Sequence, residues 1–419
     1  MPIDPKIQKK VDKLNPPKAA GLFAIRYAFR NPAKGEGVGL DGIADEALIR
    51  AYIKGLNNVQ HAMTTLPWKK HPFNPVPLKV RVFVADFYPP GMYQEDNDIY
   101  ILLPSGTGEP DLKAELLNAR ITAIHEGFHA IISSYYPANL DYSQYQSWAW
   151  IDEGTAVYME SRLVRQSHDY YRYLRSWICQ PEAPLDEDPL AFPMAPYRAV
   201  MFIKYLDKLF HEGFVDKVWC NASTSKDPFE VIRKTLPAGY NFLSGEHDDN
   251  DIFASYCLDA YFLADPNSCC FDENLHKRFG ERAIAFTFNV SASEEPQVAS
   301  DTLDHLACRY YKIVPLDGVR KITVRLKPDL SGETPLRAQL VKVKNGVIKG
   351  EQKKLMPKTA ASAQENSLVL CEGMELTALE EVSHLILVVS NHAATRRDGK
   401  ALARHLYDEQ RYSLEIIAE

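Results

Sequence analysis

Long hydrophobic runs are absent from this sequence, and so is the apolar core of a signal peptide. No stretch approaches the roughly 18 apolar residues that a membrane-spanning helix needs. The first residues, MPIDPKIQKKVDKLNPPKAAG, are polar and proline-rich. The sequence therefore predicts no membrane span. It leaves two compartments open, the cytoplasm or export followed by removal of a leader.

Cysteine is also scarce. The chain contains seven cysteines in 419 residues, and no two of them form a CxxC pair. So few and so scattered a set excludes a disulfide scaffold. Cys269 and Cys270 are adjacent, which disfavours an unstrained bridge between them. We expect buried or free thiols, with one incidental disulfide as the alternative.

Clusters of positive charge are missing as well. The formal net charge is −7, and the sequence contains no stretch in which Lys and Arg are clustered. Because phosphate contacts need clustered Lys and Arg, nucleic acid is not an expected partner. Hydrophobic residues make up 46% of the chain and charged residues 25%, proportions typical of a soluble globular protein. At roughly 100–200 residues per domain, we expect two or three domains.

The pattern of apolar residues divides the chain into three parts and predicts an α+β fold. Residues 1–105 combine strand-like runs, such as Leu78–Phe87, with a helical run from about Ala44 to Met63. Residues 106–290 are predicted to be mainly helical. In residues 300–419, short β-like runs alternate with turns, which predicts an appended β-sandwich.

Individual elements can be predicted within these parts. Two more strands are expected at Leu22–Phe29 and Asn97–Pro104, the second ended by its proline and a turn. Three helices are expected at about Asp111–Tyr135, Asp152–Gln166 and Pro196–Phe210.

The first of these helices carries the apolar stretch ITAIHEGFHAII, in which His125 and His129 stand four residues apart. On a helix this spacing places both imidazoles on one face, where they can reach one metal ion. Glu126 lies about 100° around the helix and can approach a metal-bound water from the side. The apolar flanks would bury the helix and hold the ligands stiffly. The pattern alone also fits two histidines that are hydrogen-bonded within a core.

A catalytic zinc site needs a third protein ligand and an open position for water. The stretch SWAWIDEGTAVYMESRL begins at Ser147, and with HEGFH it resembles the gluzincin metallopeptidases. In that group the third ligand is a glutamate on a second helix, in a phrase like W-x-x-E-G-x-A-x-Y-x-E. The resemblance implies that Glu153 completes a Zn²⁺ site with the two histidines. Glu160 lies two turns further on the same face. We assign it a supporting hydrogen bond to a ligand histidine or a nearby group, with a solvated surface glutamate as the alternative.

A third segment, APYRAVMFIKYLDKLF from Ala195, is similar to the one that follows the zinc ligands in aminopeptidases of the leukotriene-hydrolase kind. There a tyrosine after a proline supports the oxyanion, which implies that role for Tyr197. The Lys-Gly pair that follows this tyrosine in the family is replaced by Ala199 and Val200. Tyr205 is the alternative donor, and either tyrosine could instead be a core residue.

Taken together, the resemblance implies a gluzincin-type catalytic core, a small mixed sheet plus a helical lobe, with an appended β-sandwich. The metal would activate a water, and Glu126 would act as the general base. The strand at Asn97–Pro104 would be the sheet edge along which an extended peptide substrate pairs. No G-x-M-E-N segment is present to hold a free amino terminus, so an endopeptidase is expected and a zinc aminopeptidase is an alternative.

Two further expectations follow from the C-terminal part. Its pattern of short strand-like runs is similar to that of β-sandwich modules appended to secreted bacterial peptidases. This similarity favours a secreted or periplasmic protein over a cytoplasmic one. The competing hypothesis is a non-catalytic binding or adhesion protein on a peptidase-like scaffold, in which the β-sandwich is the functional domain.

Overall fold

The structure is a computed structural model in which the chain divides into two compact units. The first comprises Met1–Leu140, Ile151–Tyr170 and Phe210–Lys226, and the second comprises Asp141–Trp150, Tyr171–Leu209 and Asp227–Glu419. The residues that the structure describes are 18–20, 23–26, 46–65, 78–84, 91–94, 98–103, 112–164, 169–187, 194–211, 213–243, 251–329, 336–354, 356–359, 368–376, 382–392 and 410–419.

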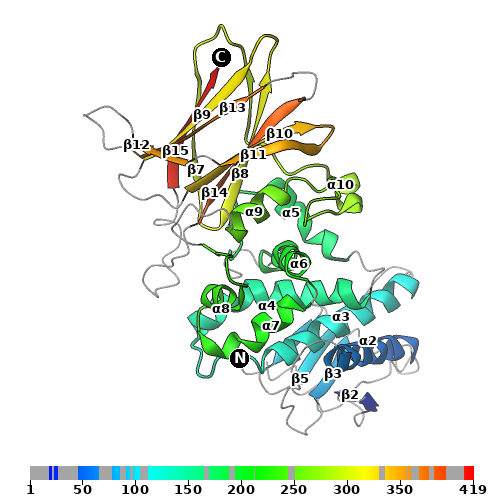
Figure 1. The fold of residues 1–419 in the computed structure, drawn as a ribbon. Helices are drawn as coiled ribbons and strands as arrows, with labels where there is room; N and C mark the ends of the chain where they lie inside the picture. Colours follow the sequence, from blue (N-terminus) through cyan, green and yellow to red (C-terminus); the bar gives the residue numbers. More distant parts are fainter. Residues whose placement is uncertain are drawn as a thin grey trace. The chain divides into compact units, whose positions relative to one another are not determined.

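A five-stranded mixed sheet belongs to the first unit, with strand order β1-β2-β3-β5-β4 (Figure 1). The neighbours β2, β3 and β5 are parallel, and antiparallel strands flank them on both sides. This sheet confirms the strands that were predicted in the N-terminal part. The strands are β1 (Lys18–Ala20), β2 (Phe23–Arg26), β3 (Leu78–Val84), β4 (Gly91–Gln94) and β5 (Asp98–Leu103).

The edge of this sheet is not where the sequence predicts it. The strand expected at Asn97–Pro104 forms as β5, but β4 pairs with it in antiparallel register, with Met92 opposite Tyr100. The edge strand of the described sheet is therefore β4, and the predicted edge position of β5 is wrong. A strand of four residues is too short to show a clear alternation of apolar and polar side chains.

The helix pair α2 (Glu46–Thr65) and α3 (Leu112–Ile132) packs beside this sheet. Both helices were predicted from their periodicity. They approach closely at Gly55, where an added Cβ would lie 2.5 Å from the carbonyl oxygen of Arg120 and 2.7 Å from Cβ of Ala123. A second close contact is at Gly127, where a Cβ would lie 3.0 Å from a methyl carbon of Val59. Glycine at these two positions lets α2 lie directly against α3.

The helix α4 (Tyr142–Leu163) begins ten residues before the predicted start at Asp152. A capping box explains the earlier start. The backbone N–H of Gln144 donates to the Asp141 carboxylate at 2.8 Å, and the Gln144 side chain accepts from the Asp141 N–H at 3.1 Å. The boundary between the two units falls within α4, after Trp150. The helix α7 (Phe214–Cys220) also lies in the first unit.

The second unit begins with an aromatic helical core. Phe202 packs against Trp150, Tyr205, Phe242 and Tyr256, with ring centroids 5.0–6.3 Å apart. The predicted helix at Pro196–Phe210 forms as a 3₁₀ turn that leads into α6 (Val200–Leu209). The other helices of this unit are α5 (Leu174–Cys179), α8 (Pro228–Thr235), α9 (Ile252–Asp259) and α10 (Glu273–Phe279).

Two five-stranded sheets follow, in the orders β11-β10-β14-β8-β6 and β12-β13-β9-β15-β7 (Figure 1). They share one buried core, and Tyr311 of the first sheet hydrogen-bonds Tyr412 of the second at 2.6 Å. The β-runs predicted within residues 300–419 are confirmed as strands, whereas β6 lies at the end of the part that was predicted to be mainly helical. The strands of the two sheets are β6 (Phe286–Val290), β7 (Gln297–Leu303), β8 (Ala307–Pro315), β9 (Lys321–Pro328), β10 (Leu336–Lys344), β11 (Val347–Lys354), β12 (Met356–Thr359), β13 (Leu368–Glu375), β14 (His384–Asn391) and β15 (Gln410–Ala418).

The described structure also bears on three general expectations. The chain combines helices with mixed and antiparallel sheets, which confirms the α+β class. None of the helices in the described ranges is long and apolar enough to cross a membrane. The described cysteines are free thiols, as expected, namely Cys179, Cys220, Cys257, Cys269, Cys270 and Cys308.

Candidate metal centre

Three side chains of the first unit converge between α3 and α4. The Nε2 atoms of His125 and His129 are 2.9 Å apart, and Oε2 of Glu153 lies 3.1 Å and 3.3 Å from them. Tetrahedral zinc binds nitrogen and oxygen ligands at about 2.0–2.2 Å, which separates any two ligand atoms by about 3.4 Å. The three atoms therefore have nearly the spacing of one face of a tetrahedral site, and they could hold a metal ion.

Helix geometry positions the two histidines. One turn of α3 separates them, and their rings meet edge to face with centroids 4.6 Å apart. The rest of this turn is buried, because Ile124, Phe128 and Ile131 face the core. The imidazoles thus project from a helix that packing fixes on its other faces.

The second nitrogen of each imidazole is held by a carboxylate. Nδ1 of His125 lies 2.7 Å from Glu160 Oε1, and Nδ1 of His129 lies 2.8 Å from Asp152 Oδ1. In a neutral imidazole this arrangement places the proton on Nδ1 and leaves the Nε2 lone pair free to bind a metal. Glu160 thus has the hydrogen bond that the sequence predicts for it, and its solvated alternative is wrong because the residue is buried.

Asp152 and its neighbours were missed by sequence reasoning. Tyr136 Oη donates to the second oxygen of the Asp152 carboxylate at 2.6 Å. The Tyr136 ring in turn packs edge-on against Trp219 of α7, whose Nε1 donates to Thr155 Oγ1 at 3.0 Å. The position of Asp152 directly before the ligand glutamate was a usable signal. Residue spacing gives no such signal for Tyr136, because this residue follows the end of α3.

Glu126 lies beside the triad and is 5% exposed. Burial raises its pKa to about 7, the Glu153 and Glu160 carboxylates act in the same direction, and the two histidines oppose the shift. Its Oε2 is buried with no hydrogen-bond partner among the described residues. A buried carboxylate oxygen without a partner is unfavourable, and a water on a bound metal would supply the missing hydrogen bond.

The charges of the cluster favour a cation. Burial and the neighbouring imidazole lower the pKa of His125, but hydrogen bonds to Glu153 and Glu160 outweigh them and raise it to about 10. Burial also opposes the shift at His129, whose pKa the carboxylates of Asp152 and Glu153 raise well above its usual value. Several buried carboxylates around two imidazoles therefore make positive charge favourable at this point. The donor set fits Zn²⁺, which binds imidazole nitrogen and carboxylate oxygen.

The two candidate oxyanion donors belong to the second unit, whereas the triad lies in the first. The Tyr197 ring stacks on Tyr173 with centroids 4.7 Å apart and is partly exposed. Tyr205 is 2% exposed within the aromatic core. Tyr205 is thus a core residue, and the role of Tyr197 stays a prediction.

A second cluster has the hydrogen-bond order of a serine hydrolase. Ser390 Oγ lies 2.8 Å from Nε2 of His392, and Nδ1 of that ring lies 2.9 Å from Asp251 Oδ2. Ser390 is only 1% exposed, so no peptide or other extended substrate can reach it. The other Asp251 oxygen accepts the first backbone N–H groups of α9. We interpret this cluster as a structural link between α9 and β14.

Comparison with known proteins does not identify a family. No protein-family model and no curated protein matches the sequence. Among solved structures, the pre-peptidase C-terminal domain of a collagenase from Bacillus anthracis is 8% identical, with a TM-score of 0.19, and the match covers 32% of this chain and 98% of that one. A family GH115 4-O-methyl-alpha-glucuronidase with specificity for decorated arabinogalactans is 9% identical, with a TM-score of 0.17, and the match covers 83% of this chain and 52% of that one. Likenesses this weak carry no argument about fold or function.

Proposed function

We propose that the protein is a zinc-dependent peptidase of the gluzincin type. The observation that carries this proposal is the triangle of two imidazole nitrogens and the Glu153 oxygen, with both other ring nitrogens tied to carboxylates. Core histidines could be satisfied by hydrogen bonds alone. Their convergence on a third ligand atom at metal-ligand spacing is what a zinc site requires.

The residues of the first unit have distinct roles in the proposed reaction. When bound, Zn²⁺ supplies a water of lowered pKa and polarises the substrate carbonyl. Glu126 takes the proton of that water on its carboxylate and delivers it to the leaving amine. Asp152 and Glu160 keep both imidazoles in the tautomer that presents Nε2. The oxyanion role that the resemblance implies for Tyr197 stays a prediction, since this residue belongs to the other unit.

The proposed substrate is a peptide or protein that binds in an extended conformation. The edge strand β4 offers backbone groups for pairing with such a chain, in place of the predicted edge at β5. The absence of a G-x-M-E-N segment supports an endopeptidase over an aminopeptidase. Export of the protein, with cleavage of substrates outside the cytoplasm, is part of the same proposal.

A binding protein that has lost catalysis is the competing candidate. The buried Glu126 argues against it, because a carboxylate with an unpartnered oxygen destabilises the fold unless a ligand uses it. A protein that only binds through its sandwich would have no use for this group beside a complete ligand set.

The test combines metal analysis with peptide digestion. The purified full chain should contain equimolar zinc, and it should cleave members of a quenched peptide library in a chelator-sensitive manner. Glu126→Gln should keep zinc and lose cleavage by about 100-fold or more. The matched control is Glu115→Gln, an exposed glutamate on the same helix, which should change neither. Equimolar zinc without cleavage of any peptide would support the binding protein, and full activity of Glu126→Gln would refute the assigned base.

A further inference from the structure

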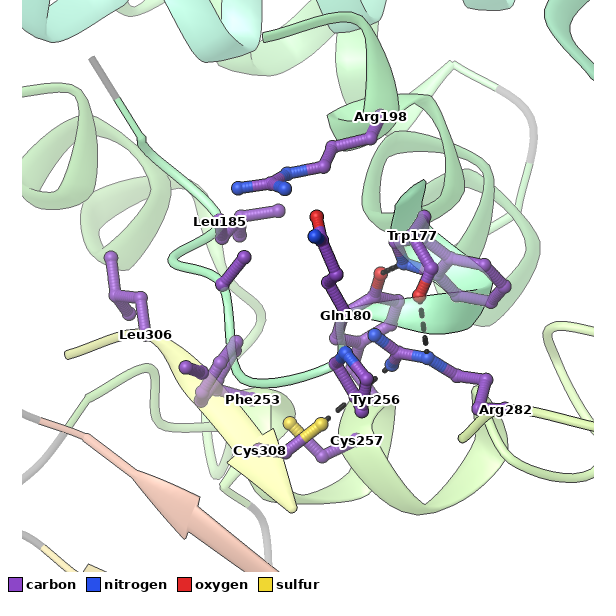
Figure 2. Close-up of a pocket in the computed structure, with 13 residues that line it drawn as sticks. Trp177, Gln180, Leu185, Arg198, Phe253, Tyr256, Cys257, Arg282, Leu306 and Cys308 are labelled. Atoms are coloured by element: carbon purple, nitrogen blue, oxygen red, sulfur yellow. Dashed lines mark hydrogen bonds between the residues drawn. The ribbon is translucent and has the colours of Figure 1, made fainter. Parts of the chain in front are cut away.

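A small cavity in the second unit brings two cysteines together (Figure 2). Cys257 comes from α9 and Cys308 from β8, and both are free and buried. Figure 2 shows their sulfur atoms side by side, and each thiol influences the pKa of the other. The cavity has a volume of about 20 Å³. A site needs roughly 10–15 Å³ to hold one water, so only a very small molecule fits here.

Arg282 also lines this cavity, and its charge has an unusual environment. The side chain is buried, its Nε donates to the Trp177 carbonyl at 3.0 Å, and the guanidinium lies 4.3 Å from the centre of the Trp177 ring. No described carboxylate lies within ion-pair distance of it, whereas Arg198 on the same cavity pairs with Glu187. A buried guanidinium is stabilised by a nearby anion, so the side chain that could supply the negative charge has to be identified.

Cys308 is the side chain that is placed to become this anion when its thiol loses the proton. Nη1 of Arg282 lies 3.6 Å from Cys308 Sγ and donates to Tyr310 Oη at 2.9 Å. Tyr310 in turn donates its proton to the Cys257 carbonyl at 2.6 Å, and its oxygen accepts a hydrogen bond from the Cys308 thiol at 3.2 Å. Burial raises the pKa of the Cys308 thiol, but the neighbouring Cys257 thiol and the charge of Arg282 outweigh it and lower the pKa below its usual value. Cys257, by contrast, stays protonated because burial raises its pKa.

We propose that Cys308 and Cys257 form a peroxide-reactive dithiol, in which Cys308 is the nucleophile and Cys257 resolves the product. The proposal combines three observations, namely the neighbouring thiols, a buried arginine that reaches Cys308 and has no carboxylate partner among the described residues, and a cavity that both cysteines line. Hydrogen peroxide is close to the size that the cavity accepts. Glutathione disulfide, which could carry out the same oxidation, is far too large.

The reaction balances without any further reactant. The Cys308 thiolate attacks one oxygen of hydrogen peroxide, the O–O bond breaks, and the released hydroxide takes a proton to become water. The sulfenic acid left on Cys308 is attacked by the Cys257 sulfur. The S–O bond breaks, the hydroxyl leaves with the Cys257 proton as a second water, and a disulfide joins α9 to β8. Two electrons pass from the thiols to the peroxide.

The experiment uses the full chain and hydrogen peroxide as the probe. After exposure, the protein is denatured in an alkylating agent and its peptides are mapped by mass spectrometry. A peptide pair linked through Cys257 and Cys308 should accumulate, whereas equal oxidising equivalents of glutathione disulfide should not produce it in the folded protein. If both thiols stay alkylatable while the exposed Cys179 is oxidised, the proposal is wrong. Equal reactivity with glutathione disulfide would refute the size argument.

Variants then assign the two roles. Cys257→Ser should stop the reaction at a sulfenic acid on Cys308, which dimedone traps, and Cys308→Ser should give no dimedone adduct on Cys257. Arg282→Gln should slow the reaction of Cys308 by about tenfold at neutral pH, because less thiolate is present. The control Cys179→Ser should behave as the wild type. The wild-type map decides the proposal even if a variant fails to fold, and trapping at Cys257 instead of Cys308 would reverse the assigned roles and overturn it.

Discussion

Tyr136 Oη donates a 2.6 Å hydrogen bond to one oxygen of Asp152, and the other oxygen of that carboxylate holds Nδ1 of His129 at 2.8 Å. The tyrosine thus reaches the proposed metal through two hydrogen bonds and no direct contact. Such outer hydrogen bonds orient a ligand and increase its basicity.

Tyr136→Phe should weaken zinc binding while leaving the fold intact. The substitution removes one hydroxyl and keeps the ring that packs against Trp219. We expect zinc affinity to fall by about tenfold, because loss of an outer hydrogen bond to a ligand system has effects of that order. Competition with a coloured chelator measures the change. The exposed Tyr145→Phe is the control, and equal affinities in the two variants would argue against the relay through Asp152.

Glu153→Gln should separate the ligand role from the base role of Glu126. The amide lacks the charge that draws a cation toward the two imidazoles, so we expect zinc affinity to fall by about 100-fold or more. Zinc content after dialysis and peptide cleavage are measured together. Glu126→Gln should lose cleavage only, whereas Glu153→Gln should lose both. Full zinc occupancy in the Glu153 variant would remove this residue from the ligand set.

Gly55→Ala should destabilise the first unit. Alanine favours a helix over glycine by about 1 kcal/mol, but its Cβ would lie 2.5 Å from the Arg120 carbonyl oxygen, so backbone has to move. We expect a net loss of about 1–3 kcal/mol in the free energy of unfolding, together with weaker zinc binding because α3 is displaced. Urea denaturation provides the measurement. Asn57→Ala, an exposed change on the same helix, should be neutral or stabilising.

The ion pair of His305 should make stability depend on pH in the second unit. Nε2 of His305 lies 2.8 Å from Asp186, and Nδ1 lies 3.0 Å from Asp304. Burial lowers the pKa of this histidine, but Asp186 and Asp304 outweigh it and raise the pKa to about 10. The folded state therefore binds the proton more tightly than the unfolded state. Its contribution to stability is complete below about pH 6.5 and is lost as the pH rises through about 10.

His305→Gln tests this dependence. We expect the substitution to lower the free energy of unfolding by about 1–3 kcal/mol at pH 6, with a smaller difference from the wild type at pH 10. Urea denaturation at several pH values measures both. A difference that grows with pH would contradict the assigned pKa direction.

Local periodicity determined which parts of this structure could be predicted from sequence. His125 and His129 lie on one face of a helix because their spacing places them there, and the spacing to Glu153 is enough for a second helix beside α3. Contacts between distant segments are not encoded in this way. The hydroxyl of Tyr136, the side-chain pair of Cys257 and Cys308, and the pairing of β4 with β5 depend on how the chain folds back.

The capping box at the start of α4 was readable in principle. Asp141 followed three residues later by Gln144 is a recognised start signal, and the sequence prediction did not use it. The predicted start at Asp152 would have placed the ligand glutamate in the first turn of its helix. In the structure, Glu153 lies well inside α4, where the backbone is constrained on both sides.

The contact at Gly55 has a consequence for how the protein would acquire its metal. Neither α2 nor Gly55 supplies a ligand, yet α2 fixes the helix that presents both imidazoles, and it does so by contacts that involve no ion. The chelating atoms would therefore stand ready before loading. Uptake would then be limited by diffusion of the hydrated cation and loss of its waters, and little by rearrangement of the chain.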